Sequence, residues 1–175
     1  MIYPFENIKP IIGENAHIAE NASIIGDVEL GPNVNIWYGA VLRGDMNSIK
    51  ISANTNIQDN AVVHVGSDNP VCVGENVTIG HGAIVHGCTI GSNCLIGMGS
   101  ILLNGCVIGA GSLVGAGSLV TEGTVIPPGS VVMGSPAKVI RPMRESDTAG
   151  NETMYREYLK YAERVLPGKP CDEQD

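Results

Sequence analysis

The 175-residue chain has few aromatic side chains and little positive charge. It contains one Trp and one Phe, and 18 acidic residues against 10 basic ones give a formal net charge of −8. A surface of this sign repels phosphate groups, which argues against nucleic acids and anionic membranes as partners. With so few aromatic residues, small and β-branched side chains must fill the core.

Long apolar runs, a secretion signal and paired cysteine motifs are also missing. No stretch is long and apolar enough to cross a membrane as a helix, and the N-terminus lacks the pattern of a signal peptide. We therefore expect a soluble, cytoplasmic protein with no membrane partner. The five cysteines include no CxxC pair. Three of them, Cys88, Cys94 and Cys106, occupy small positions of an apolar repeat, which predicts buried free thiols.

Aliphatic residues recur about every six positions through most of the chain. A second apolar or small residue lies two positions earlier, so both point to one face of a short strand. The repeat extends back to Ile18, and extra residues at 43–50 and 64–72 should form protruding loops. Units this small must stack on their neighbours, which predicts a β-solenoid. The clearest aliphatic positions are Val73, Ile79, Val85, Ile90, Ile96, Leu102, Ile108, Val114, Val120, Ile126 and Val132.

Over residues 16–136 this pattern resembles the hexapeptide repeats of left-handed parallel β-helix proteins. The resemblance implies that three units form one triangular coil. We expect an all-β solenoid domain at 1–140 and a C-terminal α-helix and tail at 141–175. Apolar spacing predicts the helix at 151–166, with Asn151 as N-cap, packed along the solenoid or a neighbouring subunit. The last residues, 169–175, should be disordered.

Stacking of the coils places the histidines. The residues after one aliphatic column line one corner: Arg43, His64 and His86. The residues just after the next column line a second corner: Trp37, Gln58 and His81. Adjacent strands lie about 4.8 Å apart, so His64 and His86 can approach one metal, whereas His81 is too far away in the same chain.

A second copy of the chain resolves this separation. The first corner of one protomer can face the second corner of its neighbour, and a head-to-tail contact of this kind must close into a ring. For triangular columns we expect a homotrimer with three metal sites. Three histidine ligands leave one tetrahedral position open for water, which is typical of catalytic rather than structural zinc.

Several motifs resemble the γ-class carbonic anhydrases. The resemblance implies Zn²⁺, or alternatively Fe²⁺ or Co²⁺, bound by His64, His81 and His86 across the trimer interface, with CO₂ and bicarbonate as substrates. It also implies site roles for four residues: Gln58 as a hydrogen-bond partner of bound water or bicarbonate, Arg43 and Asp45 as an intersubunit ion pair, and Tyr158 near the metal. Asp59 would support interface order. The motifs are Leu42-Arg43-Gly44-Asp45, Asn56-Ile57-Gln58-Asp59-Asn60, the segment 80–91 and Gly97-Met98-Gly99-Ser100.

One departure from that family concerns proton transfer. Met46 stands where the archetypal enzyme has a glutamate, and Asp68 is the only acid of the loop at 65–70. Two alternatives therefore stay open. The motif at 134–138 resembles the terminal coil of hexapeptide acyltransferases, which favours an acyltransferase or acyl-CoA thioesterase. The second alternative is a trimeric protein that binds a metal for stability and has no carbonic anhydrase activity.

Overall fold

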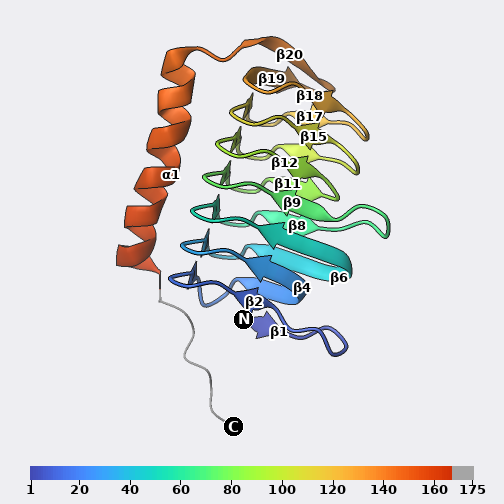
Figure 1. Cartoon of the computed structure of the whole chain (residues 1–175), viewed down its shortest axis with the longest axis vertical. Helices are drawn as coiled ribbons and strands as arrows, with labels where there is room; N and C mark the ends of the chain where they lie inside the picture. The colour runs from blue at the N-terminus through green and yellow to red at the C-terminus, as the bar shows by residue number, and fades with distance from the viewer. Residues whose placement is uncertain (167–175) are drawn as a thin grey trace.

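The chain forms a parallel β-solenoid with one helix, α1, lying along its side (Figure 1). The computed structural model describes residues 1–166. The prediction for 169–175 and the fifth cysteine, Cys171, lie outside this range. The elements are β1 Ile2–Tyr3, β2 Ile11–Ile12, β3 His17–Ile18, β4 Ser23–Leu30, β5 Asn35–Ile36, β6 Val41–Ile51, β7 Asn56–Ile57, β8 Val62–His64, β9 Val71–Val73, β10 Thr78–Ile79, β11 Ile84–His86, β12 Thr89–Ile90, β13 Leu95–Ile96, β14 Ile101–Leu102, β15 Val107–Ile108, β16 Leu113–Val114, β17 Leu119–Val120, β18 Val125–Ile126, β19 Ser130–Gly134, β20 Ala137–Pro142 and α1 Glu145–Val165.

Strands of successive coils pair in parallel, in the register that the repeat predicts. In one sheet the order β3, β5, β7, β10, β13, β16, β19 follows the stack from coil to coil. The column Leu42–Val63–Val85 and the column Ile36–Ile57–Ile79 both form as residue-to-residue pairs. Among the named strands of residues 1–166, only β19 and β20 pair antiparallel, where the chain leaves the solenoid. The expected left-handed β-helix class is confirmed.

One apolar core runs through the whole stack. The inward aliphatic residues of each column are almost completely buried, among them Ile57, Ile79 and Leu102 at 0% exposure. Cys88, Cys94 and Cys106 are buried among them as free thiols, as predicted, and burial raises the pKa of Cys94 to about 11. Single short strands supply one or two apolar residues each, so only the stacked units together exclude water.

Asparagines at one corner form a ladder along the axis of the stack. Asn33, Asn54, Asn76 and Asn93 adopt positive φ, and each side chain hydrogen-bonds to the next at 3.0 Å. Asparagine tolerates this left-handed conformation better than most residues. These asparagines therefore have two roles: their backbone conformation forms the turn, and their side chains hydrogen-bond successive coils to each other.

One of the two protruding loops predicted from the extra residues is instead an irregular part of a long strand. Residues 43–50 belong to the long strand β6, which pairs with β4 around the corner through an irregularity between Gly26 and Val28. Gly44 pairs with Gly26 and Ile49 pairs with Val28, so residues 45–48 have no partner on β4. The second insertion does form a loop, which Gly66 and Asn69 close by reciprocal backbone hydrogen bonds of 3.0 and 3.1 Å.

Helix α1 begins six residues earlier than predicted. Asn151 is not its N-cap but a buried residue of the helix, and its Nδ2 donates to the backbone oxygens of Asn93 and Ser112. The first turn is held instead by Asp147, whose carboxylate accepts hydrogen bonds from Arg141 and from the backbone N of Arg144. These contacts with the end of β20 extend the helix through a weakly apolar segment. No helix in residues 1–166 is long and apolar enough to span a membrane.

Candidate metal centre

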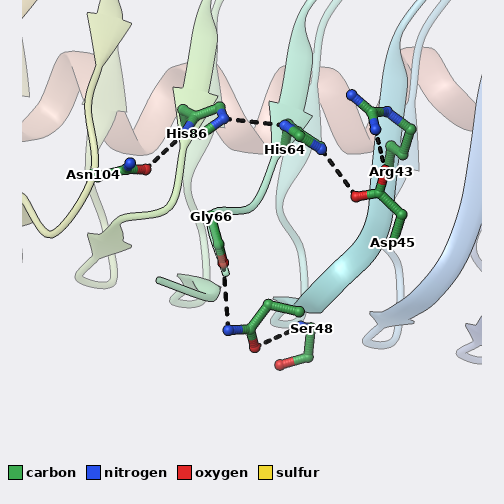
Figure 2. A network of polar contacts seen from close by, with 8 residues as sticks. Arg43, Asp45, Ser48, His64, Gly66, His86 and Asn104 are labelled. Atoms are coloured by element: carbon green, nitrogen blue, oxygen red, sulfur yellow. Dashed lines mark hydrogen bonds and ion pairs between the residues drawn. The ribbon is translucent and has the colours of Figure 1, made fainter. Parts of the chain in front are cut away.

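His64 and His86 lie side by side at one corner of adjacent coils. They end strands β8 and β11, and the parallel register places the two residues directly opposite each other, next to Arg43 of β6. His64 Nδ1 and His86 Nε2 are 3.0 Å apart. Figure 2 shows the row continuing from Asn104 through the two imidazoles to Asp45 and Arg43. The predicted approach of these histidines is confirmed.

The outer nitrogens of both rings are occupied. His64 Nε2 lies 3.0 Å from Asp45 Oδ1, and His86 Nδ1 lies 2.7 Å from Asn104 Oδ1. Both partners are acceptors, so each outer nitrogen carries a hydrogen. The inner nitrogens face each other at 3.0 Å, which is a hydrogen-bond distance. One proton shared between the two rings satisfies both nitrogens, as a cation bound by both would.

His81 lies away from the other two histidines, as expected for a single chain. Its Nδ1 is 2.9 Å from Asp59 Oδ2, its Nε2 is 3.3 Å from the Tyr158 hydroxyl, and its side chain is 45% exposed. No group of three or more His, Cys, Asp or Glu side chains in residues 1–166 could hold a metal. His64, His86 and His81 therefore do not come together as one metal site within a single chain.

The expected alignment of Gln58 with His81 is wrong by one residue. Ile57 pairs with Ile79, so Gln58 stacks beside Gly80, and His81 follows it. Gln58 is 3% exposed, its Nε2 donates to Asn56 Oδ1 at 3.2 Å, and its Oε1 accepts the backbone N–H of His81 at 3.2 Å. The amide thus fixes the backbone of His81. Gln58, His81 and Tyr158 line one cavity of about 300 Å³ between α1 and the solenoid.

Arg43 and Asp45 form an ion pair within one chain. The resemblance implied a pair between subunits, whereas here both residues lie on β6, two positions apart. Partial burial raises the pKa of Asp45, but hydrogen bonds from His64 and Arg43 outweigh it, so the pKa lies below its ordinary value. Asp45 therefore stays ionised and links the guanidinium to His64.

Tyr158 joins α1 to the second corner. Its ring packs edge-on against Trp37 with centroids 5.2 Å apart, and its hydroxyl reaches His81 Nε2. Burial raises the pKa of the phenol, and the nearby Asp59 and Tyr161 raise it further. The phenol is therefore protonated at neutral pH and donates to the His81 lone pair. The resemblance placed Tyr158 near the metal; in this structure its hydroxyl lies 3.3 Å from His81, and its position relative to a metal stays a prediction.

Asn104 is a site residue that the sequence reasoning did not single out. It follows β14, whose Leu102 continues the column of Val63 and Val85 by one more coil. The sequence signal for Asn104 was its position two residues after Leu102, a member of the same aliphatic column. With Asn104 included, each of the three histidines has one nitrogen on an oxygen acceptor, as metal-bound imidazoles do.

Comparisons with known proteins agree with the fold. The family described as bacterial transferase hexapeptide (six repeats) matches residues 9–44, 73–102 and 87–122. Protein YrdA of Escherichia coli is 42% identical over 95% of this chain and 94% of its own. A carbonic anhydrase of Geobacillus kaustophilus is 44% identical over 91% and 88%. The crystal structure of a hexapeptide transferase family protein from Anaplasma phagocytophilum superposes with a TM-score of 0.91 at 42% identity, over 95% of this chain and 98% of that one.

Proposed function

This chain belongs to the γ-class carbonic anhydrase-like family of hexapeptide-repeat proteins, and on that basis we propose that it hydrates CO₂ reversibly to bicarbonate. The observation that carries the proposal is the state of the three histidines. His64, His86 and His81 each give one nitrogen to an oxygen acceptor. In the neutral imidazole the other nitrogen is then a lone pair that a metal can bind. Such second partners orient metal-binding imidazoles in many proteins.

The proposed ligands are His64 and His86 of one protomer and His81 of its neighbour. The two sets lie on different corners of one prism, so the contact is head-to-tail and closes as a homotrimer. Zn²⁺ suits three imidazoles with one open position, and Fe²⁺ or Co²⁺ would accept the same donors. On this proposal the ion replaces the Tyr158 hydroxyl at His81 Nε2.

A bound divalent cation would supply Lewis acidity, lowering the pKa of a water molecule to about 7. The chain's own residues perform the remaining tasks. Gln58 Nε2 donates one of its two hydrogens to Asn56, and the second is available to a bicarbonate oxygen in the shared cavity. Asp59 and Asp45 hold their imidazoles and offset the added positive charge. Arg43, 45% exposed, can attract the bicarbonate anion.

The test compares His81→Ala with His17→Ala, a histidine on the first coil away from both corners. Protein purified without chelators is analysed for metal, and CO₂ hydration is followed by stopped flow on the same samples. We expect stoichiometric metal and activity in the wild type and in His17→Ala, and neither in His81→Ala. Wild-type protein without stoichiometric metal would contradict the proposal.

A hexapeptide acyltransferase or acyl-CoA thioesterase is the second candidate. The matching family and the Anaplasma structure both carry the word transferase in their descriptions. Such an enzyme needs one general-base histidine and no metal. It would keep turnover of an acyl-CoA after metal removal, whereas the anhydrase would lose all activity. A metal-stabilised protein without anhydrase activity would lose metal and thermal stability in His81→Ala and show no CO₂ hydration in either form.

A further inference from the structure

Asn104 lies in the turn after β14, one coil beyond His86. Strands β14 and β11 pair through Leu102 and Val85, which fixes the height of the turn relative to the histidine. From there the Asn104 side chain reaches across the corner, and its Oδ1 comes within 2.7 Å of His86 Nδ1 (Figure 2). This contact closes the row of polar groups at the end opposite Asp45.

Two glycines make room for the amide. A Cβ placed on Gly87 would lie 2.4 Å from Asn104 Oδ1, and one on Gly66 would lie 3.3 Å from the same atom. Gly87 directly follows His86 and has φ of 55°, a conformation that other residues seldom adopt. The amide oxygen thus occupies a space that exists only because residues 66 and 87 have no side chain.

We propose that Asn104 is the positioning residue of His86: its amide oxygen holds the Nδ1–H tautomer and keeps Nε2 as the lone pair that faces His64. The inference rests on the proposed function for its purpose, since a fixed lone pair matters to a metal ligand. The hydrogen bond itself is a property of the metal-free chain. It can therefore be tested separately.

Asn104 differs from the two other histidine partners in charge. Asp45 and Asp59 are carboxylates, whereas an amide orients His86 without adding a negative charge to the site. The acceptor, not the charge, is the required feature. Asn104→Asp therefore keeps the function of the residue, and Asn104→Leu, of nearly the same shape, removes it.

The first measurement is the tautomer of His86 in metal-free protein. With ¹⁵N-labelled histidine, long-range ¹H–¹⁵N spectra at alkaline pH distinguish the protonated from the free ring nitrogen. The chain has only 4 histidines, so single substitutions assign the signals. We expect hydrogen on Nδ1 in the wild type and in Asn104→Asp, and a shift of population to Nε2–H in Asn104→Leu. Wild-type protein with hydrogen on Nε2, or an unchanged tautomer in Asn104→Leu, would overturn the inference.

The second measurement is Zn²⁺ affinity by competition with a chromophoric chelator. Loss of a second partner typically weakens metal binding about 10–100-fold, which is the change expected for Asn104→Leu and not for Asn104→Asp. Glu122→Ala, at the same corner one coil further on, is the control and should bind as the wild type does. Weaker binding in Asn104→Leu and Asn104→Asp alike would overturn the inference. Wild-type protein that shows the expected tautomer but binds no Zn²⁺ would refute the proposed function and leave the positioning of His86 supported.

Discussion

Leu102→Ala tests whether the solenoid has one tightly packed core behind the histidine corner. Leu102 is 0% exposed and lies between Val85, which precedes His86, and Val120 of the next coil. Truncating a buried leucine costs about 3–5 kcal/mol, and the larger values apply where the surroundings cannot collapse. Here backbone hydrogen bonds hold the strands on both sides, so we expect the upper part of this range.

The free energy of unfolding should be measured by urea titration at one fixed protein concentration, because subunit association contributes to it. For a chain of this size the loss corresponds to a fall in Tm of about 6–20 °C. Val125→Ala is the matched control, since that side chain is 68% exposed, and it should change the free energy by less than about 0.5 kcal/mol. A loss below about 1 kcal/mol in Leu102→Ala would refute the idea of a shared rigid core.

Three further substitutions test the start of helix α1, the absence of a glutamate at position 46, and the space that Gly87 leaves for Asn104. The Arg141 hydrogen bond lowers the pKa of Asp147 to about 2. The ionised carboxylate therefore stabilises the fold fully above pH ~4, and this stabilisation is lost as the pH falls towards 2. The Tm of Asp147→Asn should lie below that of the wild type at neutral pH and equal it only near pH ~2. Met46→Glu should raise kcat for CO₂ hydration on the order of 100-fold with unchanged metal content, and an unchanged kcat would show that proton transfer is not limiting. Gly87→Ala should lower Zn²⁺ affinity, whereas Gly82→Ala, with similar φ but no atom within 4 Å, should lower stability alone.

Most of the fold could be predicted from the repeat, because every coil places aliphatic residues in the core at the same spacing. It correctly placed Arg43, His64 and His86 on one corner, since parallel pairing transmits position from strand to strand. Local spacing failed where tertiary contacts decide. Strand β6 resumes after its insertion because it pairs with β4 on both sides of the unpaired residues 45–48. Helix α1 starts early because Arg141 holds Asp147.

The candidate site was only partly visible in the sequence. Counting from aliphatic positions misplaced His81 by one residue, because Gly80 intervenes between it and Ile79. Asn104 was missed because a turn asparagine is a common feature, and only the register shows that this one reaches His86. The metal and the partner subunit follow from donor chemistry and symmetry, and they stay predictions.

The sharing of each site between two subunits is tested most directly by mixing two defective chains. His81→Ala keeps the first corner intact, and His86→Ala keeps the second. The two chains, coexpressed with different affinity tags and purified on both, give trimers in which one junction of the three joins two intact corners. We predict no metal in either variant alone and about one third of the wild-type content in the mixed trimers. Mixed trimers as empty as the parents, or metal retained by His81→Ala alone, would contradict the account.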